Sequence, residues 1–566
     1  MLLVREILKA SNPDKDARDM ESLEKASEAL KTFMKRIDRA SGAAQDRHDV
    51  KLLKQKILFK NEYVNMGLND EKRKIIHEGI LSRKDIGKSD AAASGDIQFY
   101  LLDNMLLFLK AKAVNKWHQH KVFQRPIPLP LLFASPSEDM PPLRKYIGSS
   151  PASSGTIVKP EYNSTNPKNA ITFLYYGAKQ RYQVTLFAPQ YAGLQTLLEK
   201  IKQEQQRIIN DTSMINITKM SDKFFDYSNK ITSVTSCDGG RKMLIATDSG
   251  LYIGDIKRQE VKIPEPTSDK SSSETKSTHT AGSTNQTAFF STPVLLVQRN
   301  NITQIAVLEE FKSIILLVDK RLYSCPLQLL AAGNNGTSYF KKHAKELINH
   351  VNFFSEGDCN GKRLIVTGHN SSHSIKFFEL DHPLLSSSNS ANNKKSLKKK
   401  ITEVVFDSEP VSISFLKANL CVGCKKGFQI VSISQNAHEP LLDPADTSLE
   451  FALRDTLKPL AIYRVGNMFL LCYTEFAFFV NNQGWRKKDS HIIYWEGEPQ
   501  KFAIWYPYIL AFDSNFIEIR KIDTGELVRC ILGDKIRLLQ SNTQEILYAY
   551  EDLRGFDTVA SLDFWG

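Results

Sequence analysis

The sequence predicts a mainly β protein, in which a seven-bladed β-propeller follows a smaller β-sandwich or barrel with a C-terminal helix, and α-helices come first. Three observations support this prediction. A hairpin pattern recurs through the second half of the chain. Upstream of it, several strand-like runs are followed by one amphipathic helix. Near the N-terminus, apolar residues recur at three- and four-residue steps, which is the spacing of one face of a helix.

The recurring hairpin is an apolar run, a small polar turn and a second apolar run, as in LIATDSGLYIGDI from residue 244. Copies begin at residues 244, 315, 364, 420, 469, 509 and 546. Most intervals are about forty to fifty residues, a period that is typical of propeller blades. Each hairpin cannot bury both of its faces alone, but seven stacked around an axis can. An irregular all-β sandwich is the alternative that this count disfavours.

Two of these copies resemble the citron homology domain, over a region running from about residue 228 to 563. The resemblance implies a protein-interaction module without known chemistry. The positions that match the family pattern are Thr247, Gly250, Leu251, Tyr252, Thr303, Gln304, Ile305, Val307, Leu308, Asp319, Leu322, Tyr323, Pro326 and Leu327.

Residues 72–208 carry the pattern of strands followed by one closing helix. DIQFYLLDNMLLFLKAKA is a predicted hairpin turning at Asp103–Asn104, and ITFLYYGAKQRYQVTLFA is another that turns near Gly177. The helix YAGLQTLLEKIKQEQQRI places Leu194, Leu198, Ile201 and Ile208 on one face. This order resembles a pleckstrin homology domain, with Leu197 at the position of the family's helix tryptophan.

In the phosphoinositide-binding members of that family, basic residues on the first hairpin hold the lipid phosphates. Here the candidate lipid-binding residues are Arg83, Lys84 and Lys88. Gln98 stands at the arginine position of the second strand, so the bidentate phosphate clamp is incomplete. Anionic lipid is therefore predicted as a non-specific partner, and a solvated basic face is the alternative.

The first seventy residues are predicted to be helical, with a stop and restart between Ser11 and Pro13. One apolar face, packed on something, is expected from Leu23, Ala26, Leu30, Phe33 and Ile37. The segment resembles the end of a Dbl homology domain, whose terminal motif is matched by Leu2, Leu3 and Val4, with Leu8 on the same helix. Asp38 stands where members of that family often have an asparagine against the GTPase.

The order of Dbl, pleckstrin and citron homology is that of the fungal Rho exchange factors of the cell-wall integrity pathway. We expect a helical remnant at 1–70, a pleckstrin domain at 72–208, a linker at 209–227 and the propeller at 228–563. The linker carries Phe224, Phe225 and Tyr227, so it is able to dock on one side.

The resemblance implies a regulatory and targeting region that binds a Rho-family GTPase and an upstream wall-sensor or scaffold protein. It implies a cytoplasmic protein recruited to the inner face of the plasma membrane at growth sites. The first two helical regions of a Dbl domain, with its catalytic Glu, do not precede this segment. We therefore expect a fragment without exchange activity. A citron-domain trafficking adaptor and a lipid-sensing membrane scaffold remain as alternatives.

Charge identifies one further candidate site. The chain has a formal net charge of +12, and a basic run occupies part of a polar, low-complexity stretch at 386–400. Such a run is able to contact an acidic partner or lipid, or to act only as a solubilising loop. The candidate partner-binding residues are Lys394, Lys395, Lys398, Lys399 and Lys400. No zinc-finger, RNP or KH pattern occurs, so nucleic acid is not an expected partner.

Motifs of enzyme chemistry are missing from the sequence. It has no Gly-rich phosphate loop with Lys-Ser/Thr, no His-Glu-x-x-His and no Gly-x-Ser-x-Gly, so no catalytic residue and no cofactor is predicted. Cys421 and Cys424 are three positions apart on an expected strand, which places them on opposite faces and disfavours a metal site. The pair His118 and His120 is likewise interpreted as surface. The seven scattered cysteines indicate a reducing compartment.

Overall fold

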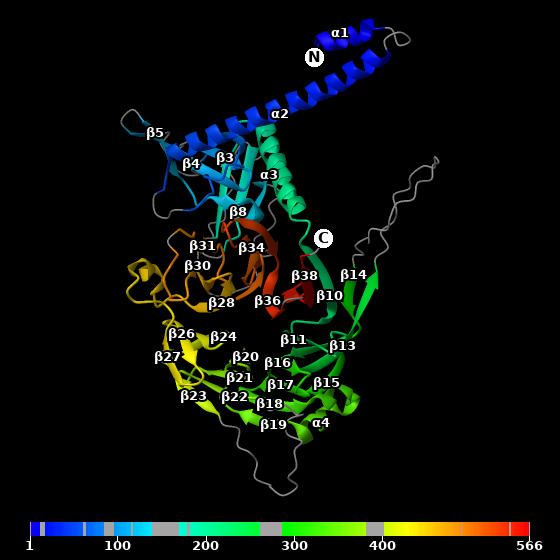
Figure 1. Ribbon diagram of the computed structural model, residues 1–566, viewed down its shortest axis with the longest axis vertical. Coiled ribbons are helices and arrows are strands. Elements are labelled where there is room, and N and C mark those ends of the chain that lie inside the picture. Colours follow the sequence, from blue (N-terminus) through cyan, green and yellow to red (C-terminus); the bar gives the residue numbers. More distant parts are fainter. Residues whose placement is uncertain are drawn as a thin grey trace. The chain divides into compact units, whose positions relative to one another are not determined.

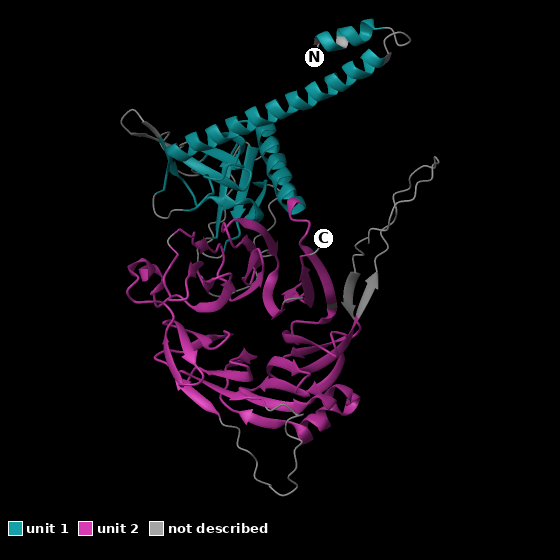
Figure 2. Ribbon diagram, viewed as in Figure 1, with its two compact units in different colours: residues 1–210 teal, residues 211–566 magenta. Residues whose placement is uncertain are grey.

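The computed structural model describes residues 2–11, 17–59, 64–83, 96–114, 117–137, 169–177, 181–260, 286–380, 401–487, 489–542 and 545–564. The chain divides into two compact units, Met1–Asn210 and Asp211–Gly566 (Figure 2). The first unit holds the helices and the smaller sheet, and the second holds the propeller.

Two helices begin the first unit. Helix α1 spans Leu2–Ala10 and helix α2 spans Ala17–Lys56, so the predicted break near Ser11 is confirmed (Figure 1). The prediction that residues 1–70 are helical is wrong beyond Lys56. The chain there enters the short strand β1, Ile57–Leu58, which pairs in parallel with β5, Trp117–Val122.

The sheet of the first unit has the order β1-β5-β4-β3-β2-β9-β8-β7, with β6 paired to β4. Both predicted hairpins are present in it. The helix after them, α3, spans Tyr191–Asp211 and buries Leu194, Leu197, Leu198 and Ile201. The remaining strands are β2 Ile75–Ser82, β3 Asp96–Leu102, β4 Met105–Val114, β6 Ile127–Pro128, β7 Leu132–Pro136, β8 Ala170–Tyr175 and β9 Tyr182–Phe187.

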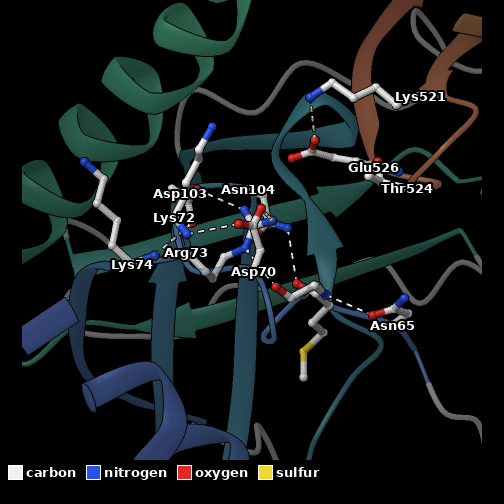
Figure 3. Close-up of polar contacts among 12 residues, drawn as sticks. Asn65, Asp70, Lys72, Arg73, Lys74, Asp103, Asn104, Lys521, Thr524 and Glu526 are labelled. Carbon is white, nitrogen blue, oxygen red and sulfur yellow. Dashed lines mark hydrogen bonds and ion pairs between the residues drawn. The ribbon is translucent and has the colours of Figure 1, made fainter. Parts of the chain in front are cut away.

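A buried ion pair stabilises the turn at Asp103–Asn104, between β3 and β4. The Arg73 guanidinium, which is only 4% exposed, donates to Asp103 at 2.9 Å, and Asp70 lies 3.8 Å from it (Figure 3). From α3, Arg207 donates to the backbone carbonyl of Asp103 at 2.8 Å. One turn thus links the segment after α2 to the closing helix. Removing one partner of such a pair leaves a buried charge uncompensated.

The second unit is a seven-bladed propeller, so the predicted fold is confirmed. Blade one consists of β11 Ile231–Cys237, β12 Lys242–Thr247, β13 Gly250–Glu260, β14 Gln286–Phe290 and β15 Val294–Gln298. Blade two consists of β16 Ile302–Leu308, β17 Ser313–Val318, β18 Arg321–Pro326 and β19 Lys345–Ile348. Blade three consists of β20 Phe353–Cys359, β21 Lys362–His369, β22 Ser374–Glu379 and β23 Thr402–Val405. Helix α4, Gly336–His343, lies between β18 and β19 in the chain.

Blades four to seven follow in chain order (Figure 1). Blade four consists of β24 Pro410–Phe415, β25 Leu420–Cys424, β26 Gly427–Ser432 and β27 Ala437–Pro440, and blade five of β28 Pro459–Val465, β29 Met468–Tyr473, β30 Phe476–Val480 and β31 Ile493–Tyr494. Blade six consists of β32 Lys501–Trp505, β33 Tyr508–Phe512, β34 Phe516–Lys521 and β35 Leu527–Leu532. Blade seven consists of β36 Asp534–Ser541, β37 Ile546–Glu551, β38 Asp557–Asp563 and β10 Asn216–Phe225.

Each of the seven sequence copies begins on the second strand of a blade, which is buried on both faces, and continues into the third strand. In β17, Ile314 and Leu316 pack in a cluster shared with blade one. Ile315 and Leu317 pack in a cluster shared with blade three. Since successive strand residues point to opposite faces, a continuous apolar run is what a strand between two blades requires.

The ring is closed by a strand from outside the repeats. Strand β10 pairs antiparallel with β38, from Asn216↔Asp563 to Phe225↔Asp557, and becomes the outer strand of blade seven. The predicted linker at 209–227 therefore supplies a blade strand. Phe225 is 1% exposed and makes an edge-to-face contact with Tyr252 of blade one at 5.2 Å between ring centroids.

Ionic contacts reinforce the junction between blades seven and one. Glu551 accepts from Lys230 at 2.9 Å and from Lys535 at 2.8 Å. Arg537 donates to Asp557 at 2.6 Å, and the same carboxylate accepts from the backbone N–H of Ile231 at 2.8 Å. The first and last strands of the ring are thus held by side chains as well as by the sheet.

Candidate functional site

The family-pattern residues of the propeller have structural roles. The Thr247 hydroxyl donates to the carbonyl of Gly250 at 3.0 Å and closes the turn between β12 and β13. The Gln304 amide oxygen accepts from the backbone N–H of Phe354 at 2.9 Å, which ties blade two to blade three. Thr247 and Gln304 thus stabilise a blade turn and a contact between blades.

The cysteine pair Cys421 and Cys424 is part of the hydrophobic core of the propeller. Cys421 packs in a core cluster with blade five, whereas Cys424 packs in a cluster with blade three. Burial raises the pKa of Cys421 strongly and that of Cys424 to about 12, so both remain protonated thiols. Across the part of the chain that the structure describes, no group of three or more His, Cys, Asp or Glu could hold a metal ion. His120 is partly buried.

Two lysines that the sequence reasoning missed lie at one end of the first unit's sheet. The register places Leu81, Ile97, Lys110 and Lys121 opposite one another across β2, β3, β4 and β5. Cross-strand partners share a face, so both lysines lie on the same face as Ile97, and at this end of the sheet each lysine is only half-buried. The Lys110 ammonium lies 4.6 Å from the centroid of the Phe123 ring. The alternation in LKAKAV was the signal for a strand there.

Gln98 lies on the other face of this sheet. It pairs with Leu109, which packs in the cluster that includes Leu53 of α2. Its amide donates to the Tyr100 hydroxyl at 2.6 Å, and this bond holds the side chain in place. Gln98 therefore lies on one face of the sheet and the two lysines lie on the other. The three side chains do not form one phosphate site on a shared face.

The predicted lipid-binding residues are only partly described. Arg83 is exposed and follows the last residue of β2, Ser82. Lys84 and Lys88 lie outside the described residues. Lys394, Lys395, Lys398, Lys399 and Lys400 also lie outside them, so the partner-binding site assigned to this loop stays a prediction.

Helix α2 has two different halves. Toward its C-terminus, Val50 and Leu53 are 2% and 3% exposed, and Leu53 packs on the sheet. In the first half, Leu30, Phe33 and Ile37 are 39%, 56% and 50% exposed. The predicted apolar face exists there, and helix α1 contacts α2, in which Leu23 is half-buried, but the described residues leave Leu30, Phe33 and Ile37 exposed. Asp38 is exposed beside this face.

A search of the described helices for a membrane span finds none that is long and apolar enough.

Comparison with known protein families gives two matches. The CNH domain family matches residues 239–542, and the pleckstrin homology domain family matches residues 75–205. Among solved structures, the "AfRom2 CNH domain" is 38% identical with a TM-score of 0.50, covering 62% of this chain and all of that chain.

Curated relatives extend the similarity to the whole chain. RHO1 GDP-GTP exchange protein 2 of Saccharomyces cerevisiae is 79% identical over 568 residues, which are 100% of this chain and 41% of that protein. RHO1 GDP-GTP exchange protein 1 of the same organism is 49% identical, over 100% of this chain and 47% of that protein. Rho1 guanine nucleotide exchange factor 1 of Schizosaccharomyces pombe is 35% identical, over 95% and 39%. The chain thus spans less than half the length of these relatives, and its predicted resemblance to fungal Rho exchange factors is confirmed.

Proposed function

The chain belongs to the CNH domain family, and from this we infer that it is the regulatory and targeting region of a Rho-family guanine nucleotide exchange factor. The observation that carries the proposal is the similarity of the entire chain to exchange proteins, across both its pleckstrin and CNH regions. In this role the first unit contacts the membrane and the propeller contacts proteins. A Rho-family GTPase and an upstream wall-sensor or scaffold protein are the proposed partners.

Membrane contact is supported by the basic end of the first unit's sheet. Lys110, Lys121 and the exposed Arg83 come from β4, β5 and the residue after β2. Each basic residue near an anionic surface contributes about 1 kcal/mol. Three such residues give weak, salt-sensitive attraction, which is suited to reversible recruitment to the inner face of the plasma membrane and not to permanent anchoring.

This recruitment is tested by sedimentation with vesicles of neutral lipid containing phosphatidylserine. We expect the double variant Lys110→Gln with Lys121→Gln to bind about thirty-fold more weakly, because two contributions of about 1 kcal/mol are lost. The single variant Lys417→Gln changes a lysine in the turn between β24 and β25 and serves as the control. Equal binding of the double variant and the wild type would remove the basic end of the sheet from the proposal.

Exchange of nucleotide by this chain alone is not part of the proposed function. An exchange factor accelerates release by binding the nucleotide-free GTPase better than the loaded forms. The exposed face of Leu30, Phe33 and Ile37 on α2 supports the view that further helices are needed to complete such a surface.

The proposal for the GTPase is tested by calorimetric titration of a fungal Rho GTPase in its GDP, GTP-analogue and nucleotide-free states. Saturable binding in at least one state is the expected result. A preference for the GDP state would indicate recruitment of substrate, whereas a preference for the GTP state would indicate feedback by product. No binding in any state would contradict the GTPase as a partner of this region.

A further inference from the structure

The propeller has a polar pocket of about 490 Å³ where blades two, three and four adjoin. The residues that line it come from loops on one face of the propeller. These loops are the turns after the second strands of blades two and three, and the connections that lead into blades three and four. A pocket of this size is sufficient for a few residues of peptide or a small ligand. The residues used below are Lys320, His350, Asn352, Asn370, His373 and Glu409.

The pocket is held open by backbone contacts between its loops. The N–H of Val351 donates to the carbonyl of Lys320 at 2.9 Å, and the N–H of Asn370 donates to the Asn352 side chain at 2.9 Å. Lys320, His350 and His373 have left-handed φ values of 60°, 56° and 46°. These conformations are uncommon for residues other than glycine and persist only where the surroundings maintain them. The backbone from which these exposed side chains project is therefore fixed by the fold.

The lining of the pocket holds one lysine, Lys320, and one acidic residue, Glu409. Its one carboxylate, Glu409, accepts from Lys425 at 2.8 Å. The pKa of Glu409 is lowered mainly by this hydrogen bond, against a smaller effect of burial, with further attraction from His373 and Lys458. Glu409 is thus paired with Lys425 from outside the lining, and Lys320 is the lysine of the lining that remains for an anionic ligand.

Two groups in the pocket lack partners. Within the described part of the chain, Lys320 has no carboxylate within ion-pair distance. The Oδ1 atom of Asn370 is buried and accepts no hydrogen bond from a described residue. A buried acceptor without a protein donor needs a hydrogen-bond donor from outside the chain, which a water or a ligand can provide. A ligand that satisfies both needs carries an anion and an N–H donor.

We propose that this pocket binds an extended acidic segment of a partner protein. An Asp or Glu carboxylate of the segment pairs with Lys320 between the imidazoles of His350 and His373. A main-chain N–H of the same segment donates to Asn370 Oδ1. This deepens the proposed function by naming the chemistry that the propeller recognises in a protein partner, and it rests on that function only in treating the propeller as the protein-binding part.

The test uses a fluorescein-labelled, capped peptide of alternating glutamate and glycine, followed by anisotropy with the full chain. We expect saturable binding that weakens with added salt, and Lys320→Glu to weaken it at least about ten-fold. Lys417→Glu makes the same charge change in the turn between β24 and β25 of blade four, on the opposite face of the propeller. This control variant is expected to leave binding unchanged. Asn370→Ala is expected to weaken binding while the salt dependence persists, because it removes only the neutral acceptor. Circular dichroism melting of each variant separates lost binding from lost folding.

Three results would overturn the inference: no saturable binding to the wild-type chain, equal affinity of the Lys320→Glu variant, or displacement of the peptide by inorganic phosphate at matched carboxylate concentration. The last would identify a site for a small anion alone. A chain that binds the GTPase but not the peptide refutes the pocket and leaves the proposed function standing. A chain that binds the peptide through Lys320 but no GTPase refutes that partner and leaves the pocket standing.

Discussion

In β17 of the propeller, Ile314 and Ile315 point to opposite sides and both are fully buried, whereas Leu30 and Phe33 of helix α2 are apolar and exposed. The two regions differ in whether the rest of the chain covers their apolar side chains. Each blade finds the next one in the same chain, and β10 closes the ring. The first half of α2 contacts helix α1, but the described residues leave Leu30 and Phe33 uncovered. The ring of blades therefore buries its own apolar strands, whereas α2 keeps part of its apolar face exposed among the described residues.

The strongest test of the comparison is at the ring closure. Phe225 is 1% exposed between blades seven and one, so Phe225→Ala should lower the free energy of unfolding of the propeller by about 3–5 kcal/mol. Tyr227, two residues further along and 76% exposed, is the matched control, and Tyr227→Ala should change it by less than about 0.5 kcal/mol. Urea denaturation followed by tryptophan fluorescence measures both. Similar values for the two variants would mean that β10 does not close the ring.

A second test compares the two halves of α2. Leu53→Ala removes a side chain buried against the sheet and should cost about 2–5 kcal/mol of the first unit's stability. Phe33→Ala removes a larger side chain that is 56% exposed and should cost less than about 0.5 kcal/mol. Hydrogen exchange of amides in the sheet reports the stability of this unit separately. A large effect of Phe33→Ala would show that the exposed half is packed after all.

The smallest expected effect concerns the ionic contacts at the ring closure. Burial raises the pKa of Glu551, but the hydrogen bonds from Lys535 and Lys230 outweigh it, so this pKa is lowered from its ordinary 4.5. The ionised carboxylate therefore stabilises the fold above about pH 4.5, and this contribution is lost as the pH falls through the lowered pKa. Glu551→Gln should make the dependence of stability on pH shallower below that pH. Thermal melting from neutral to acidic pH gives the comparison, and parallel curves would exclude the effect.

The sequence predicted the repeating part of the fold well because each second strand is apolar on both faces and carries its own turn. It did not predict β10, since the partner of Asn216 is Asp563, at the other end of the propeller. Local periodicity contains no information about so distant a pairing. The same limit applies to α2, where the spacing of Leu30 and Phe33 predicts an apolar face but not what covers it.

The candidate site was predicted less well. Arg83 was found by resemblance, but Lys110 and Lys121 become neighbours only through the register of β4 with β5. Gln98 was identified as the residue that leaves the phosphate clamp incomplete, but the face of the sheet on which it lies could not be predicted, because that face depends on the sheet and the sequence alone leaves it open. In the propeller, Lys320 and His373 come from different blades and are brought together only by the ring.

The most direct test of the account is the release of a fluorescent GDP analogue from a fungal Rho GTPase in the presence of this chain, at concentrations where calorimetry detects binding. The account predicts binding without acceleration, because the proposed function is targeting and regulation and does not include preferential binding of the nucleotide-free GTPase. Release that becomes faster with increasing chain, and that is abolished by Phe33→Asp on the exposed face of α2, would contradict it and would place exchange activity within this region.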